Sequence, residues 1–480
     1  MVTSAAEVGS GPWDALTSEH DYRVEEVTGA VPDGLRGVLY RIGPGRLEIG
    51  GHRLGHIFDG DGMVSRFAID DDGIGFRNRY VRTRHFNKAS QDWIGRGIGT
   101  LRPGGLAANI FRMPANVSNT NVVAHAGGLF SLWEGGRPYR LDPETLATLG
   151  REDFDGALKL LGAFSAHPKI DARTGEMFNF GIEVFPRPMI RCYRRDRSGT
   201  LTQLATFPVS RPSFCHDFAI TERYLVFLVD PIVVGRPISA LLGLDSIDNC
   251  LTFNADLGTR VALIPRDGGK ARILETDALF HFHANNAYEE PGGDVVVEIV
   301  SHDPGEGWLG WNQHVRDYET EDGTAFGGRL ERIRITASGR VHREPLLEGL
   351  GCEFPQIDHR FETAEHPATY VAAASVPAGA PDSIVAVDHA AGGVGTYTVA
   401  AGHRAQRLRA AVRRRPGPVR SRCRVAAVGG TRCVASTFAP AGARHRASGR
   451  RSGGDRGTAA PPADGLSRHL CPGVSQAMAG

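Results

Sequence analysis

Three stretches of the chain decide its fold: HPKIDARTGEMFNFGIE (residues 167–183), HDFAITERYLVFLVDP (216–231) and HANNAYEEPGGDVVVEIV (283–300). Each opens with a histidine and continues into apolar stretches on both sides of a polar turn. Alternation of apolar and polar residues around such a turn is typical of paired β-strands. The three stretches therefore indicate one small β unit that is repeated along the chain.

Two further stretches extend the repeat, NVVAHAGGLFSLWEGG from Asn121 and EFPQIDHRFETAEHPATYVAAAS from Glu353. Successive starts lie 46, 49, 67 and 70 residues apart, which suits the blades of a β-propeller at roughly 40 to 50 residues each before insertions. Turn signals recur through the first 400 residues, and strands do not alternate with helical patterns. We therefore expect an all-β propeller.

Histidines that begin successive repeats face the same central channel of a propeller. His167, His216 and His283 are thus expected to converge on one metal ion. Imidazole binds several transition metals, so histidine alone does not select the ion. A shell of neutral ligands suits a ferrous centre that handles dioxygen, but it also suits a zinc hydrolase.

Two acidic residues stand at matching places in neighbouring repeats, Glu134 and Glu353. Metal-bound imidazole usually donates its second N–H to a carboxylate or carbonyl oxygen, and these side chains are candidates for that role. Glu134 precedes two glycines and would also suit a solvated turn. Glu353 lies between Cys352 and Phe354, where an unpaired carboxylate would be costly.

The chain resembles the carotenoid cleavage oxygenases in seven stretches that follow the order of that family. They are GVLYRIGP (37–44), HIFDGDGM (56–63), EGGRPYRLDPETL (134–146), SAHPKIDARTGE (165–176), the His-Asp-Phe of FCHDFAIT (214–221), FHANNAYEE (282–290) and EFPQID (353–358).

The resemblance implies a seven-bladed propeller with one ferrous ion per chain, held by four histidines. It assigns three of these ligands to His167, His216 and His283, and it pairs Glu134 with His216 and Glu353 with His283. His281, two residues before His283, is a rival ligand. The family's His-x-x-Asn-Ala-Tyr-Glu pattern favours His283.

The chain departs from the family at its C-terminus. Residues 405–480 contain 15 Arg, no Lys, two Asp and no Glu, a net charge of +13, whereas residues 1–404 carry 40 basic and 52 acidic residues, a net charge of −12. Such a tail could be a disordered arm for nucleic acid or lipid or an ordinary disordered segment. We favour out-of-frame translation and expect no nucleic-acid partner. The propeller domain is then 1–404, and its last blade is expected to be incomplete.

The fourth histidine of the family should lie in this tail. Only His445 and His469 occur there, and neither has the expected neighbours. The loss of this ligand makes a catalytically inactive propeller an alternative for the chain.

The reaction implied by the resemblance is dioxygen-dependent cleavage of a conjugated C=C bond, giving two carbonyl products. The substrate would be a carotenoid or apocarotenoid. A lignostilbene-type substrate is the alternative, but Trp133 stands where members acting on stilbenes tend to carry Lys. The chain has no nucleophile elbow, phosphate loop or H-E-x-x-H motif.

The sequence also predicts where in the cell the protein is located. The N-terminus has no signal-peptide pattern, no window approaches 18 apolar residues, and the cysteines show no C-x-x-C spacing. We therefore expect a cytoplasmic protein. The apolar stretch DPIVVGRPISALLGL (230–244) suits either a surface that dips into a membrane or a strand with a core helix.

Overall fold

A computed structural model gives the fold of the chain. It describes residues 15–27, 31–90, 93–160, 162–184, 186–209, 213–303, 305, 327–374, 382–398, 410–413, 424–427 and 438–439.

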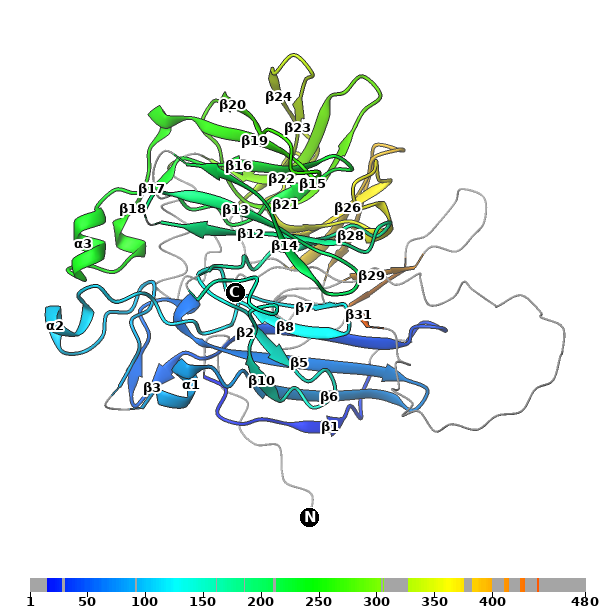
Figure 1. Ribbon diagram of the computed structural model, residues 1–480. Helices are drawn as coiled ribbons and strands as arrows, with labels where there is room; N and C mark the ends of the chain where they lie inside the picture. Colours follow the sequence, from blue (N-terminus) through cyan, green and yellow to red (C-terminus); the bar gives the residue numbers. More distant parts are fainter. Residues whose placement is uncertain are drawn as a thin grey trace, which may run out of the picture.

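Six antiparallel sheets, each of four or five strands, are arranged around a common centre (Figure 1). The first has the order β1-β6-β5-β2-β31 and comprises β1 (Asp21–Arg23), β2 (Gly37–Arg46), β5 (Asp61–Asp70), β6 (Gly73–Tyr80) and β31 (Phe438–Ala439). The second comprises β7 (Asn121–His125), β8 (Gly128–Leu132), β9 (Tyr139–Leu141) and β10 (Thr148–Arg151). The third comprises β11 (Lys169–Ile170), β12 (Met177–Glu183), β13 (Met189–Arg195) and β14 (Leu201–Pro208).

The remaining three sheets follow the same up-and-down order. The fourth comprises β15 (Ala219–Ile220), β16 (Tyr224–Val229), β19 (Thr259–Pro265) and β20 (Arg272–Thr276). The fifth comprises β21 (Phe280–Glu289), β22 (Val295–His302), β23 (Arg329–Ile335) and β24 (Val341–Pro345). The sixth comprises β25 (Cys352–Gln356), β26 (Ala368–Ala373), β27 (Ser383–Asp388) and β28 (Gly393–Thr398).

Short elements lie outside these sheets. Within the described ranges the helices are α1 (Arg84–Lys88), α2 (Gly105–Asn109) and α3 (Pro237–Leu242), and the 3-10 turns span Ile57–Asp59, Asp248–Cys250, Ala255–Leu257 and His359–Phe361. Two-stranded ribbons pair β3 (Glu48–Ile49) with β4 (His52–Arg53), β17 (Ile232–Val234) with β18 (Leu251–Phe253), and β29 (Ala410–Arg413) with β30 (Arg424–Ala427). Among the described residues no helix is both long and apolar enough to cross a bilayer.

Neighbouring sheets pack face to face through apolar side chains. The central strand β22, with the sequence VVVEIVSH, is buried along its whole length, as expected for a strand covered on both faces. Between the third and fourth sheets Phe180 meets the rings of Phe218 and Phe227 edge to face, with centroids 5.4 and 5.3 Å apart. This packing holds the inner strands around the centre, where β15 contacts β21 and β21 contacts β25.

The all-β propeller expected from the repeat is confirmed. The prediction of seven blades is wrong for the described residues, which form six blade sheets. The number seven came from the resemblance, and after Thr398 the described chain contributes only β29, β30 and β31. The sixth sheet is a complete four-stranded blade, and the incomplete last blade that was predicted would follow it. Most of the predicted tail, 405–480, lies outside the described residues.

Candidate metal centre

The imidazoles of His167, His216 and His283, here called the three-histidine centre, meet at the middle of the propeller. One ring nitrogen from each lies within 4.8 Å of the others. The ring centroids are 4.2 Å apart for His167 and His216, 5.1 Å for His216 and His283, and 5.6 Å for His167 and His283. All three side chains are buried. The histidines that sequence analysis singled out are therefore brought together in space.

His167 lies in the loop that enters β11. The Asn121 amide, from the second sheet, donates to the carbonyl of Ala166 at 2.5 Å, and the Asn179 amide donates to the carbonyl of Ser165 at 2.8 Å. These buried side chains satisfy loop carbonyls that no strand partner reaches. They fix the backbone on which His167 stands.

His216 lies in the loop that enters β15. The backbone N–H of Phe214 donates to the carbonyl of Ile232 at 2.9 Å, which anchors the start of this loop. The Phe214 ring stacks on the His216 ring at 5.7 Å with an interplanar angle of 17°, and Phe282 meets it edge-on at 5.5 Å. The ring is thus confined on two sides by aromatic side chains.

His283 lies within β21, and the pairing of β21 with β22 shifts in register between His281 and Ala284. A bulge of this kind redirects side chains at a sheet edge. It separates the two candidate ligands: the ring of His281 bonds Asp230 through Nδ1 at 2.7 Å and is not part of the three-histidine centre. The geometry favours His283 over its rival.

Glu353 holds His283 in place from the neighbouring inner strand, β25. Its Oε2 is 2.6 Å from His283 Nδ1, and its Oε1 is 2.8 Å from Nε2 of His302. Burial raises the pKa of the Glu353 carboxyl, but the hydrogen bonds that it accepts from the two histidines outweigh burial, and the pKa falls below its usual range. Glu353 is therefore an anion that accepts from both rings.

Glu134, which follows β8, contacts His216 Nδ1 through Oε1. Its side chain is 30% exposed, whereas that of Glu353 is fully buried. Solvent screens an interaction of this kind more strongly than a buried one. The expected pairing of each carboxylate with its histidine matches the observed contacts, and Glu353 holds its histidine more firmly.

These contacts leave the Nε2 lone pairs of His216 and His283 available to a metal ion. A histidine that donates its Nδ1–H to a carboxylate presents the lone pair of Nε2. Nε2 of His216 and Nε2 of His283 are buried and have no hydrogen-bond partner. Burial lowers the pKa of His283 to about 4, so its ring is neutral near pH 7. The donor set therefore fits a borderline divalent metal ion.

The described residues provide no fourth histidine for this group. His445 and His469 lie outside the described residues, so the prediction about them stays a prediction.

Aromatic and aliphatic side chains surround the centre. Their buried members are Leu47, Ile57, Ile232, Phe280, Phe282, Phe354 and Ala372. Trp133, next to Glu134, is also buried. This apolar wall reaches the centre itself: the Phe282 ring lies 5.5 Å from the ring of His216, and the Phe354 ring lies 5.3 Å from the ring of His283.

A second group of potential ligands, Glu298, His366 and His389, lies between the fifth and sixth sheets. Asn286 Oδ1 accepts from the N–H of Thr363 at 3.1 Å, so its Nδ2 faces His366 Nδ1 at 3.1 Å and donates to it. The His366 proton then lies on Nε2, which is 3.0 Å from Glu298 Oε2. This arrangement satisfies the polar groups and leaves no lone pair on Nε2 for a metal.

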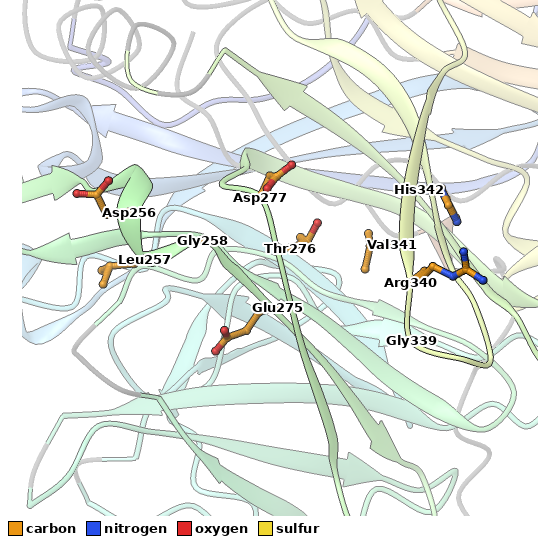
Figure 2. Close-up of a pocket in the computed structure, with 10 residues that line it drawn as sticks. All are labelled: Asp256, Leu257, Gly258, Glu275, Thr276, Asp277, Gly339, Arg340, Val341 and His342. Atoms are coloured by element: carbon orange, nitrogen blue, oxygen red, sulfur yellow. The ribbon is translucent and has the colours of Figure 1, made fainter.

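The cavity in Figure 2 does not suit an apolar substrate. It has a volume of about 570 Å³, its walls include the charged Asp256, Glu275 and Arg340, and no member of the three-histidine centre lines it.

Comparison with known proteins identifies the family. The sequence profile of the family described as retinal pigment epithelial membrane protein (RPE65) matches residues 14–411. The chain belongs to the carotenoid cleavage oxygenase family. It is 34% identical over 357 residues to apocarotenoid-15,15'-oxygenase from Synechocystis, covering 72% of each chain. It is 33% identical over 289 residues to resveratrol cleavage oxygenase 1 from Aspergillus fumigatus, covering 58% of this chain and 56% of the relative.

A solved structure supports the same assignment. Cobalt-substituted Synechocystis apocarotenoid oxygenase superposes with a TM-score of 0.76 at 31% identity, covering 88% of each chain. The family predicted from the seven stretches is confirmed, and this chain is accordingly an oxygenase of the carotenoid cleavage type.

Sequence reasoning missed His302 and the aromatic wall. His302 stands in SHDPGE at the end of β22, far in sequence from Glu353, and pairs across the sheet with Phe280. Its sequence neighbours carry no repeat signal, so only the strand register reveals its contact with Glu353.

Proposed function

We propose that this chain binds one ferrous ion at the three-histidine centre and cleaves a conjugated C=C bond of a carotenoid or apocarotenoid. The observation that carries the proposal is the convergence of three buried imidazoles in an apolar wall. One dioxygen molecule supplies both carbonyl oxygens, so the alkene and dioxygen balance the two products without a further reductant. Ferrous iron bound here supplies the redox chemistry that activates dioxygen.

The side chains of the protein set the conditions for that chemistry. Because imidazole is an uncharged ligand, a bound ion would keep its full charge, and Glu134 and Glu353 would partly compensate for it from behind the rings. By accepting from Nδ1 of His216 and His283, the same carboxylates would leave Nε2 available as the ligand atom. Phe214 and Phe282 restrict the orientation of the His216 ring.

By their names, the two relatives compared above act on an apocarotenoid and on the stilbene resveratrol. The buried Trp133 and the apolar wall favour a hydrocarbon polyene, because neither offers a charge to a phenol. A lignostilbene-type substrate is the second candidate.

Anaerobic reconstitution with ferrous iron tests the function. We expect aldehyde products from an apocarotenoid that require both iron and oxygen. Iron binding without products from any polyene or stilbene would indicate an inactive propeller, and oxygen-independent activity with zinc would indicate a hydrolase.

We also propose that the protein draws its substrate from a bilayer through an exposed apolar patch. The stretch 230–244 forms β17, which starts with the buried Ile232, and α3, none of whose residues is buried. The N–H of Phe111 donates to the carbonyl of Leu241 at 3.0 Å and so joins the two segments of the patch. The patch consists of Leu106, Phe111, Met113, Ile238, Leu241 and Leu244.

Vesicle co-sedimentation tests this contact. The double variant Ile238→Glu with Leu244→Glu should lose binding to phosphatidylcholine vesicles. Leu149 on β10 and Val394 on β28 are comparably exposed, and these two strands lie away from α3 in Figure 1. Their double Glu variant should sediment as the unmodified chain does, and equal loss in both variants would remove the proposal.

A cytoplasmic location remains our proposal. The four cysteines in the described residues, Cys192, Cys215, Cys250 and Cys352, are buried free thiols, which suits a reducing compartment.

A further inference from the structure

Residues one or two positions after the three histidines meet one another. Lys169 lies two positions after His167, Asp217 follows His216, and Ala284 follows His283. Lys169 Nζ is 3.0 Å from Asp217 Oδ1 and donates to the carbonyl of Ala284 at 3.1 Å. The N–H of Ala284 donates to Asp217 Oδ2 at 3.0 Å. One polar cluster thus joins all three ligand-bearing segments.

The carboxylate at the middle of this cluster is held rigidly. The Asp217 side chain is fully buried, and its Oδ1 also accepts from the N–H of Phe218 at 2.8 Å. Each oxygen therefore has a backbone donor in addition to the Lys169 ammonium. Charge-assisted hydrogen bonds of this kind have narrow geometry.

A gain in folding stability does not by itself explain why the buried pair of Lys169 and Asp217 is charged. Removing charges from water costs free energy that their attraction often fails to exceed, and apolar replacements are frequently as stable. The location of the pair between neighbouring sheets suggests a better explanation. The described backbone ladders run within the third, fourth and fifth sheets and do not join one to the next, so side chains must fix the spacing of their inner strands.

We propose that Lys169 and Asp217 are positioning residues that set the mutual distances of the three histidines. Metal–nitrogen bonds of about 2.0–2.1 Å tolerate errors of only about 0.2 Å. The Lys169–Asp217 pair bonds each segment within two residues of its ligand. The inference rests on the proposed function only in requiring that the three-histidine centre binds a metal.

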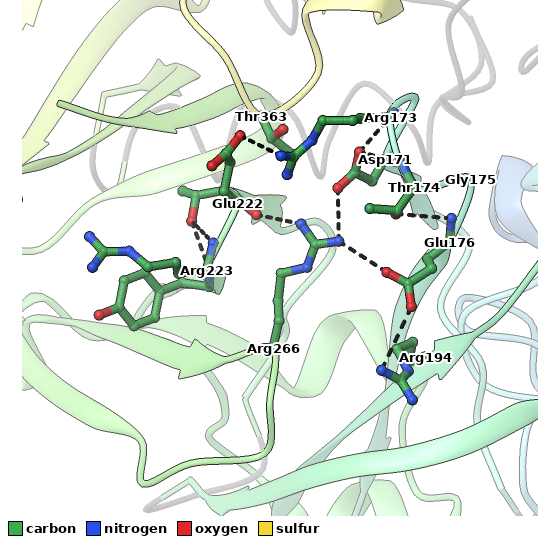
Figure 3. Close-up of polar contacts among 12 residues, drawn as sticks. Asp171, Arg173, Thr174, Gly175, Glu176, Arg194, Glu222, Arg223, Arg266 and Thr363 are labelled. Atoms are coloured by element: carbon green, nitrogen blue, oxygen red, sulfur yellow. Dashed lines mark hydrogen bonds and ion pairs between the residues drawn. The ribbon is translucent and has the colours of Figure 1, made fainter. Parts of the chain in front are cut away.

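The chain contains a matched control, the ion pair of Arg266 with Asp171 (Figure 3). Arg266 Nη2 is 2.8 Å from Asp171 Oδ2, the Asp171 side chain is fully buried, and Arg266 also donates to the carbonyl of Thr221 at 2.8 Å. This pair joins the same third and fourth sheets. It contacts no residue adjacent to a ligand histidine.

The experiment uses the full chain, stripped of metal and titrated with Co²⁺. Lys169→Met and Asp217→Asn are compared with the control variants Arg266→Met and Asp171→Asn. We expect the first pair to weaken Co²⁺ binding by about 10- to 100-fold and to shift the visible d–d bands. The control pair should lower the thermal midpoint by a similar amount but keep the original affinity and spectrum.

Lys169→Arg keeps the charge and donors and should restore affinity and spectrum. The nearly isosteric Asp217→Asn keeps the inference testable if Lys169→Met does not fold. Equal losses of affinity in the two sets of variants, or an unchanged spectrum in the first set, would overturn the positioning role. Failure of the unmodified chain to bind Co²⁺ would overturn the proposed function as well, so the two failures are distinguishable.

Discussion

Replacing Glu353 by Gln should weaken metal binding without changing any ligand. The carboxylate accepts from His283 Nδ1 at 2.6 Å and from His302 Nε2 at 2.8 Å, whereas an amide offers only one accepting oxygen. One buried ring N–H then loses its acceptor, which costs about 1–3 kcal/mol of folding stability. Because the His283 ring is no longer held in one tautomer and orientation, the Kd for Fe²⁺ or Co²⁺ should rise about 10- to 100-fold.

Glu298→Gln provides the control for this experiment. Glu298 is also a fully buried carboxylate with several donors, but it contacts no member of the three-histidine centre. We expect both variants to be destabilised to a similar degree, as measured by urea unfolding of the metal-free chain. Only Glu353→Gln should change the Kd from anaerobic titration. If Glu353→Gln loses stability but its Kd stays within about twofold of the original, Glu353 does not contribute to metal binding as predicted.

Three further predictions follow from the same contacts. His281→Gln should keep full metal stoichiometry, because that ring bonds Asp230; loss of one metal per chain would make His281 a ligand. Glu134→Gln should weaken metal binding less than Glu353→Gln, because Glu134 is partly exposed; an equal or larger effect in titration would contradict this ordering. Burial raises the pKa of Glu298, but hydrogen bonds from His366 and Arg332 outweigh it and lower the pKa to about 2, so the stability that the carboxylate contributes is complete above about pH 4.5 and is lost as the pH falls toward 2. Between pH 5 and pH 3 the unmodified chain should lose about 2 kcal/mol more stability than Glu298→Gln does, and equal losses of unfolding free energy in the two proteins would contradict this prediction.

The repeat predicted from sequence was enough to obtain the fold class and to bring three distant histidines together. Residues of one type at equivalent repeat positions converge in a propeller, and His167, His216 and His283 occupy such positions. The number of blades was not accessible in this way, because the residues after Thr398 carry little strand pattern. The prediction of seven blades therefore relied on the number that is usual in the family.

Contacts across the sheets were beyond the reach of sequence reasoning. His302 approaches Glu353 through strand register, and the Lys169–Asp217 pair forms between two inner strands with no sequence signal of their pairing. The apolar stretch 230–244 allowed a core helix or a surface helix, and only the exposure of Ile238 separates the two. Such features depend on how sheets pack, whereas periodicity reports only which face of a strand is buried.

Metal titration of the full chain is the sharpest test of whether the three imidazoles form a metal site. With Co²⁺ as a visible probe, we predict one tight site per chain whose d–d absorption disappears in the His283→Ala variant. A stoichiometry well below one, or a site that survives His283→Ala with the same affinity, would contradict the claim that these three imidazoles bind the metal.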